Sequence, residues 1–206
     1  MVYDTGDGYS GGFSQAEKTV LPYLHSRGVD VIDVLVVSHA DRDHSGGLAF
    51  LVNRIPINRH LGFGGEPCRN GERWRWATSE FLVVNGSGQS ELDTNDQSCG
   101  FLFTVGGYNL LALGDISADQ ERELVRYWRE ALSSEVVLLP HHGSDSSSSY
   151  TWLKWVDPTW ALISSGRANR FGHLHASVVD RLTQIKGAVG LNTATTGAIQ
   201  VRFLAK

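Results

Sequence analysis

The sequence contains few of the residues that mark specialised classes of protein. Its 206 residues include two Cys, one Met and five Pro, which excludes a disulfide-rich scaffold and a proline-rich, low-complexity chain. No run approaches the roughly 18 consecutive apolar residues that a transmembrane helix needs. The remaining composition, with 41% hydrophobic and 19% charged residues, is that of an ordinary globular domain.

An excess of positive charge is also missing. The 18 Lys and Arg residues are outnumbered by 22 Asp and Glu, for a formal charge of -4. A domain that binds nucleic acid by charge alone is usually basic. If the substrate is DNA or RNA, its attraction must therefore come from bound metal ions or from other parts of a longer protein.

The two cysteines, Cys68 and Cys99, lack the CxxC spacing of a structural zinc site. Two interpretations stay open. They are either independent buried thiols or a disulfide, which requires an oxidising compartment.

The order of apolar and polar segments predicts an α/β protein. Residues 31–37 form a nearly continuous apolar run, typical of a strand buried on both faces. Residues 99–113, with Gly106-Gly107 in the middle, predict a β-hairpin. We expect helices at 15–27 (disturbed by Pro22), 46–54, 117–132, from the serine run through Trp155, and 176–186, and further strands at 73–76, 81–84, 136–140, 160–163, 189–191 and 198–203. No repeat or linker is visible, so one domain over residues 1–206 is expected.

A dense cluster of metal-ligand side chains follows the apolar run 31–37. Its members are His39, Asp41, Asp43 and His44. Imidazole and carboxylate groups together suit zinc, manganese or iron. An extended or looped backbone would let His39 and Asp41 share one metal while Asp43 and His44 turn toward a second. A polar loop that only caps the next helix is the plain alternative.

Similar residues follow later predicted strands. Asp115 is either a helix N-cap or, as we expect beside the first cluster, a carboxylate that holds one or two cations. His141 and His142 are adjacent, and because successive strand side chains point to opposite faces, at most one is expected to be a metal ligand. His173 and His175 lie in a glycine-containing loop, and His173 is the stronger candidate for a function. In open α/β sheets, such strand ends meet at the ligand site.

These residues resemble the metallo-β-lactamase superfamily, whose pattern is His-x-His-x-Asp-His, then a bridging Asp after a later strand and a final His. Here Asp41 occupies the position of the second His. With that change, the chain is similar to the C-terminal domain of ComEC-type competence proteins, which are bacterial membrane channels for DNA uptake. The stretches that carry this similarity are Tyr3-Asp4-Thr5-Gly6, Cys68-Arg69-x-Gly71-x-Arg73-Trp74, Asn95-Asp96-x-Ser98-Cys99, His141-His142-Gly143-Ser144 and Asn169-Arg170-Phe171-Gly172-His173.

The resemblance implies a metallo-β-lactamase-like αββα sandwich that lacks its first N-terminal strand or strands, as in a fragment of a larger membrane protein. It also implies one or two divalent ions, zinc or manganese, and no small organic cofactor. The expected ligands are His39, Asp41, Asp43, His44, Asp115 and His141. The superfamily usually supplies a further His before the bridging Asp, where this chain offers only Asn95, Asp96 and Ser98. The choice between His141 and His173 as last ligand stays open.

The expected catalytic residues are Asp43, which would orient the attacking water, and His173 or His142, which would protonate the leaving group. By resemblance the substrate is DNA, with one strand degraded during uptake. The domain would then belong to an inner-membrane protein, face the periplasm or cell exterior, and work with the channel portion of the same chain. Two alternatives remain: a hydrolase of a small ester, lactam or thioester, and an inactive domain that binds DNA or organises the channel.

Overall fold

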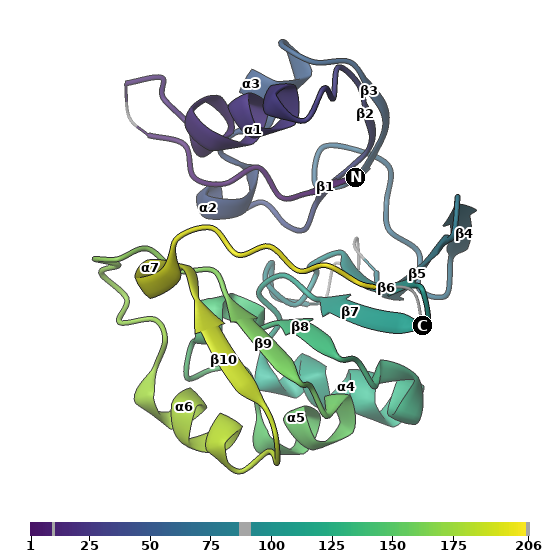
Figure 1. The fold of residues 1–206 in the computed structure, drawn as a ribbon, viewed down its shortest axis with the longest axis vertical. Helices are drawn as coiled ribbons and strands as arrows, with labels where there is room; N and C mark the ends of the chain where they lie inside the picture. The colour runs from purple at the N-terminus through teal and green to yellow at the C-terminus, as the bar shows by residue number, and fades with distance from the viewer. Residues whose placement is uncertain (10, 87–91, 205–206) are drawn as a thin grey trace. The chain divides into compact units, whose positions relative to one another are not determined.

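The chain folds into two units, each with its own β-sheet (Figure 1). A computed structural model describes residues 1–9, 11–86 and 92–204. Unit 1 comprises Met1–Arg69 and Gly86–Cys99, and unit 2 comprises Asn70–Asn85 and Gly100–Lys206. We describe each unit by itself.

The sheet of unit 1 is parallel, with the strand order β1-β2-β3. Its strands are β1 (Val2–Tyr3), β2 (Ile32–Val37) and β3 (Ile57–Gly62). The predicted apolar strand is the central one, and Leu35, Val36 and Val37 are fully buried. Burial on both faces of the central strand explains why its sequence is continuously apolar rather than alternating.

The helices of unit 1 pack on this sheet through apolar residues of the Ala16–Ile55 core cluster. A π-helical turn, Ala16–Val20, leads into α1 (Leu21–Ser26), and α2 (Arg42–Ser45) and α3 (Leu48–Val52) follow β2. Pro22 lies in the first turn of α1. Because proline has no amide hydrogen, the expected continuous helix over 15–27 changes its hydrogen-bond pattern there.

The sheet of unit 2 has seven strands in the order β10-β9-β8-β7-β6-β5-β4. They are β4 (Arg73–Trp76), β5 (Ser79–Asn85), β6 (Gly100–Val105), β7 (Tyr108–Ala112), β8 (Val136–Leu138), β9 (Trp160–Ile163) and β10 (Val189–Asn192). Pairing is antiparallel from β4 to β7 and parallel from β7 to β10. The predicted hairpin is β6–β7, and both turn glycines, Gly106 and Gly107, have the positive φ that a two-residue hairpin turn requires.

Helices cover one face of this sheet, as Figure 1 shows for α4, α5 and α6. The helices of unit 2 are α4 (Ala118–Trp128), α5 (Tyr150–Val156), α6 (Ala176–Thr183) and α7 (Thr193–Thr196), with 3-10 turns at Arg129–Leu132 and Pro140–Gly143. Ser117 caps α4 as predicted, since its side chain accepts a hydrogen bond from the Gln120 amide. Trp152 and Leu153 of α5 are fully buried in the core beneath the sheet.

The strand predicted at 198–203 is wrong. The described part of this segment forms no strand; it leaves α7 at Gly197 as an irregular chain. Its apolar residues still alternate with polar ones, and Ile199, Val201 and Phe203 are half-buried. The alternation of apolar and polar residues therefore reflects burial of one side of this segment, where Phe203 contacts Tyr108. The described residues of the segment form no hydrogen-bond ladder with a neighbouring strand. None of the described helices has both the length and the hydropathy of a membrane span.

Cys68 and Cys99 form a disulfide within unit 1. Both are almost completely buried. Of the two interpretations that the sequence left open, the structure has the disulfide and not two independent thiols. The bond links the end of the first segment of unit 1 to the end of its second segment.

Removing the disulfide should reduce stability. The bridge joins residues 31 positions apart, and closing a loop of that length stabilises a fold by about 4 kcal/mol because it restricts the unfolded chain. We expect Cys68→Ser/Cys99→Ser to unfold at a lower urea concentration than the oxidised protein. Dithiothreitol should lower the midpoint of the wild type but not that of the double variant. Two titratable thiols in unreduced, denatured wild type would contradict the pairing.

Candidate metal centre

The ligand candidates fall into two clusters, one in each unit. Cluster 1 consists of His39, Asp41, Asp43 and His44 and follows β2. Cluster 2 consists of Asp115, His141, His142 and His173 and follows β7, β8 and β9.

In cluster 1, His44 is held by the carboxylate of Asp4. Nδ1 of this buried histidine lies 2.8 Å from Asp4 Oδ2. The same carboxylate accepts hydrogen bonds from the Ser38 amide at 2.6 Å and from the Ser38 hydroxyl at 3.0 Å. Because a carboxylate only accepts, Nδ1 of His44 carries the proton. Histidines that bind metals usually have such a carboxylate on their other ring nitrogen, which makes Nε2 the ligand atom.

Asp4 reaches His44 because β1 and β2 run parallel. Tyr3 is paired with Val36, so both strands end at the same edge of the sheet. The backbone amide of Asp4 continues the ladder by donating to Val36 O at 2.8 Å. Asp4 then turns with φ of 60°, a left-handed conformation that Asp adopts more readily than most residues.

His39 and Asp41 lie together, as expected for residues that share a metal. Nε2 of His39 is 3.7 Å from Asp41 Oδ2. On its other side, Nδ1 is 3.0 Å from the Ser38 hydroxyl and 3.3 Å from the Ser98 hydroxyl. The ring centroids of His39 and His44 are 4.2 Å apart. Two hydroxyls on Nδ1 fix the ring so that Nε2 faces the half-exposed Asp41 carboxylate.

The backbone of cluster 1 differs in part from the expected loop. It is extended through Asp41, which has φ of -60° and ψ of 145°, and then turns into α2. Asp43 and His44 are therefore successive residues of a helix and point about 100° apart. His44 is buried, whereas Asp43 is exposed.

In cluster 2, both adjacent histidines face one buried carboxylate. His142 Nε2 lies 3.6 Å from Asp115 Oδ2, and His141 Nε2 lies 3.9 Å from the same atom. Asp115 is 4% exposed. It is not a helix cap, because Ser117 occupies that position.

The expectation that His141 and His142 point in opposite directions is wrong. It assumed that β8 continues, but the strand ends at Leu138 and a 3-10 turn follows. Both histidines have left-handed backbones, with φ of 50° and 55°. That turn brings both rings to the same side, so His142 is as well placed for a metal as His141.

His173 joins cluster 2 through the loop after β9. Its ring centroid lies 5.9 Å from that of His141 and 5.8 Å from that of His142. Asn169 holds the loop: its Oδ1 accepts a hydrogen bond from the His173 amide at 2.7 Å, and its Nδ2 donates to the His173 carbonyl. His175 instead caps α6, with Nδ1 accepting from the Ser177 amide.

A buried carboxylate supports the serine run behind the two histidines. Glu121 of α4 accepts hydrogen bonds from the backbone amides of Ser148 and Ser149. Burial raises the pKa of Glu121 to about 7, against the smaller opposing effects of these hydrogen bonds and of Arg181. Arg181 donates to the carbonyls of Ser147 and Ser148. The segment after His142 is therefore held from both sides.

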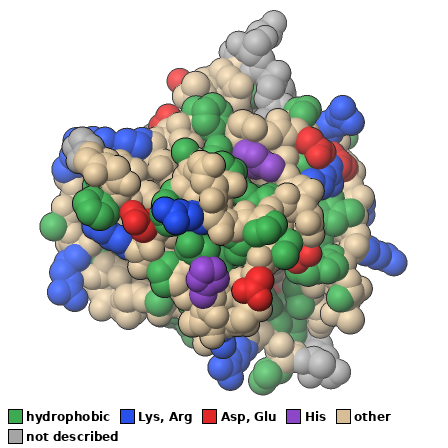
Figure 2. All heavy atoms as spheres, turned by 90° about the horizontal axis from the view of Figure 1, so that it is seen from above, with side chains coloured by type: hydrophobic (Ala, Val, Ile, Leu, Met, Phe, Trp, Pro, Cys, Tyr) green, Lys and Arg blue, Asp and Glu red, His purple; other side chains and the backbone are tan. Residues whose placement is uncertain are grey.

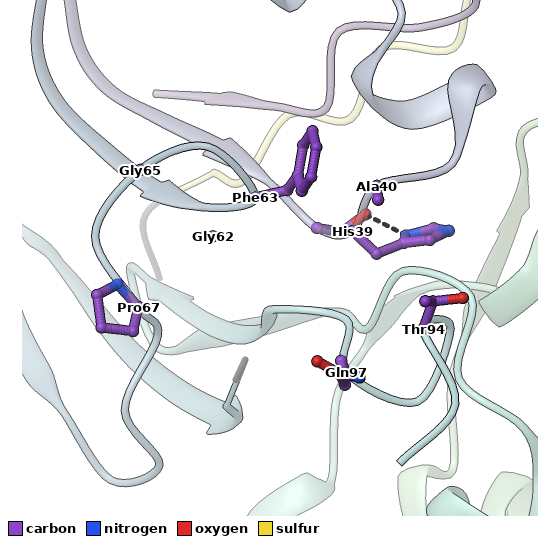
Figure 3. Close-up of a pocket in the computed structure, with 9 residues that line it drawn as sticks. His39, Ala40, Gly62, Phe63, Gly65, Pro67, Thr94 and Gln97 are labelled. Atoms are coloured by element: carbon purple, nitrogen blue, oxygen red, sulfur yellow. Dashed lines mark hydrogen bonds between the residues drawn. The ribbon is translucent and has the colours of Figure 1, made fainter. Parts of the chain in front are cut away.

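Unit 1 also contains a pocket beside His39, with a volume of about 280 Å³. Figure 3 shows Phe63 and Ala40 on one side of His39, and Thr94 and Gln97 on the other. Its dashed line is the hydrogen bond between Ser38 and His39. Apart from His39, the residues that line the pocket carry no titratable side chain.

The charged side chains do not form a single basic surface on the face shown in Figure 2. Lys and Arg side chains are spread over it, with Asp and Glu between them. This agrees with the formal charge of -4. The described residues of this face offer no broad positive patch to a polyanion.

Sequence reasoning left three supporting residues without a role: Asp4, Ser98 and Asn169. Each acts on a candidate histidine through a hydrogen bond, to His44, His39 and His173 respectively. Asp4 was visible in the sequence only as part of the Tyr3-Asp4-Thr5-Gly6 stretch that carries the resemblance. No local pattern reveals that Ser98, 59 positions away, contacts His39.

Comparison with known proteins identifies the family of this chain. Residues 1–162 match the model of the metallo-beta-lactamase superfamily. Recombination protein 2 of Haemophilus influenzae is 35% identical over 98% of this chain, and Competence protein ComA of Neisseria gonorrhoeae is 35% identical over 97%. The chain spans only 26% and 29% of the lengths of these relatives. The metallo-beta-lactamase fold protein YhfI of Bacillus subtilis superposes with a TM-score of 0.55 at 9% identity, covering 93% of this chain and 92% of YhfI. The predicted fold class and resemblance are confirmed.

The Asp4 carboxylate should matter for metal affinity. We expect Asp4→Asn to weaken zinc binding by about 10- to 100-fold, the usual loss when the carboxylate behind a histidine ligand is removed. Competition with a chromogenic chelator measures this. Asp30→Asn, a change at an exposed carboxylate of unit 1, is the matched control. Equal affinities in a folded Asp4→Asn variant would contradict the assignment.

The buried Glu121 should make stability depend on pH. Its pKa is raised from 4.5 to about 7 in the folded state, so the folded protein binds the proton more tightly than the unfolded one. Stability from this group is therefore full below about pH 4.5 and is lost as the pH rises through 7. Between pH 5 and 8 we expect wild type to lose about 2–3 kcal/mol relative to Glu121→Gln in urea unfolding.

Glu123→Gln, on the exposed side of the same helix, should keep the pH dependence of wild type. Parallel pH profiles for wild type and Glu121→Gln would show that the carboxyl of Glu121 does not titrate in this range.

Proposed function

Because the chain belongs to the metallo-β-lactamase superfamily, we propose that it is a metal-dependent hydrolase that cleaves phosphodiester bonds of DNA. Members of this superfamily are generally metal-dependent hydrolases. The observation that carries the proposal is the hydrogen bond between Asp4 and His44. It orients a buried imidazole in the manner of a metal ligand.

The donor atoms of both clusters suit a divalent ion. Cluster 1 offers His39 Nε2 and Asp41 Oδ2, 3.7 Å apart, together with Asp43 and His44. Cluster 2 offers Asp115 and the two histidines that face it. Imidazole and carboxylate donors fit zinc or manganese, and we propose one or two such ions. When bound, the ion supplies charge that activates water and polarises the phosphoryl group.

The remaining polar groups supply proton transfer and positioning. Asp43 is exposed on α2 and is proposed to orient the attacking water. His173 is proposed to donate a proton to the leaving oxygen, and the two hydrogen bonds from Asn169 hold its loop for that task. His142 is the second candidate for the donor, although its distance to Asp115 also fits a ligand.

Three observations support DNA and an oxidising location. The names of the two relatives refer to recombination and competence. The disulfide between Cys68 and Cys99 is stable outside reducing compartments. The chain covers only part of each relative, so we propose that residues 1–206 are one domain of a longer membrane protein. This domain would face the periplasm or cell exterior, act with the channel portion and degrade one DNA strand during uptake.

A hydrolase of a small ester, lactam or thioester is the second candidate. The pocket beside His39 favours it, because its lining is mostly uncharged and its volume of about 280 Å³ suits a small group.

The test is cleavage of DNA by protein reconstituted with zinc or with manganese. We expect hydrolysis of single- or double-stranded DNA that is abolished by a chelator. His44→Ala should lower the rate by at least about a hundredfold, since even a change behind a ligand costs 10- to 100-fold. His25→Ala, at an exposed histidine of α1, should retain wild-type activity.

Other results would identify the alternatives. Hydrolysis of a small ester, lactam or thioester without any cleavage of DNA would replace the nuclease proposal by the second candidate. No metal retained after reconstitution, together with binding of DNA, would indicate an inactive binding domain.

A further inference from the structure

We propose that the pocket beside His39 is a nucleobase subsite in which the Phe63 ring stacks on one base of single-stranded DNA. This inference rests on the proposed nuclease function. It adds the binding of a base to the cleavage of a phosphodiester, and it makes Phe63 a residue that holds the DNA beside the linkage that is cut.

Phe63 follows a tightly constrained turn, and its side chain is not part of the hydrophobic core. Its side chain is 46% exposed, although it lines the pocket. The turn before it requires Gly62, which has φ of +83° and where a Cβ would lie 2.0 Å from the Val37 carbonyl oxygen. The Phe63 amide then donates to the same carbonyl at 2.9 Å. An exposed aromatic ring on a backbone held in this way, at a pocket, is suited to stacking on a flat ligand.

The size and charge of the pocket fit a base. A volume of about 280 Å³ is at the lower end for ligand pockets, so it suits one ring system. Ala40, Phe63 and Pro67 supply apolar surface, and the lining has no Lys, Arg, Asp or Glu. The pocket therefore matches an uncharged ring and not a phosphate.

A polar end opposite Phe63 provides hydrogen bonds. Gln97 Nε2 donates to the Leu92 carbonyl at 2.8 Å, which fixes the side-chain amide and leaves Oε1 as an acceptor. Thr94 adds a hydroxyl on the same loop. Such groups can bind the edges of several bases, so we expect stacking with little preference among them.

The location of the pocket connects it to the chemistry. Ser38 and His39 belong both to its wall and to the surroundings of cluster 1. A base held against Phe63 therefore places its own sugar-phosphate next to a proposed metal ligand. The disulfide holds this arrangement, because Cys68 follows Pro67 and the Cys99 amide donates to the Ser38 carbonyl at 2.8 Å.

The experiment uses a single-stranded oligonucleotide with one abasic sugar-phosphate at a defined position and manganese as the metal. In wild type, kcat/KM at linkages that carry a base should exceed that at the abasic linkage by about tenfold, and the difference should lie mainly in KM. Phe63→Ala should remove this difference by slowing only the base-bearing linkages, and Phe63→Trp should preserve it. Phe13→Ala changes another exposed phenylalanine of unit 1 and should behave as wild type.

A second measurement does not depend on the folding of the variants. DNA containing 5-iododeoxyuridine, irradiated on wild-type protein, should cross-link to the peptide that contains Phe63. Three results would overturn the subsite and leave the proposed nuclease function intact. They are cleavage that does not depend on the base, an equal loss of rate at both kinds of linkage in Phe63→Ala, and cross-links found only in other peptides. Absence of all DNA cleavage, with hydrolysis of a small ester, would overturn the proposed function and the subsite with it.

Discussion

Parallel pairing of neighbouring strands decides where the polar side chains of both units lie. In unit 1 the pairing of β1 with β2 places Asp4 beside the residues that follow Val37. In unit 2 the parallel run from β7 to β9 places Asp115, the two adjacent histidines and the loop of His173 at one edge. An antiparallel neighbour would end at the opposite edge, so cluster 1 would lose the support of Asp4 and the residues of cluster 2 would not meet. The apolar interiors of these strands fix the register that the clusters require.

Much of the fold was predictable because its signals are local. The buried run at 31–37, the hairpin around Gly106-Gly107 and the cap at Ser117 each depend on a few neighbouring residues, and each was predicted correctly. The strand at 198–203 failed because alternation reports burial on one side, which an irregular chain can also have. Strand formation requires a partner edge, and sequence periodicity does not specify one.

The candidate site was predictable as a set of residue types but not as a set of contacts. The density of His and Asp after β2 pointed to metal chemistry, and the structure brings His39 and Asp41 together. The directions of His141 and His142 depend on two left-handed backbones that no local pattern indicates. Ser98 lies where the superfamily usually supplies another His, and it contacts His39 Nδ1. It therefore supports an existing ligand candidate and does not replace the missing one.

The disulfide has a consequence for the integrity of the chain. Cys68 and Cys99 bracket the segment 69–98, which includes β4 and β5 and most of the loop that carries Gln97. A protease that cuts once within this segment would leave two fragments joined through sulfur. The nicked protein would migrate as one species on a denaturing gel until a reductant separated the pieces. Where proteases are common and reductants are scarce, one cut in this segment would not release either half.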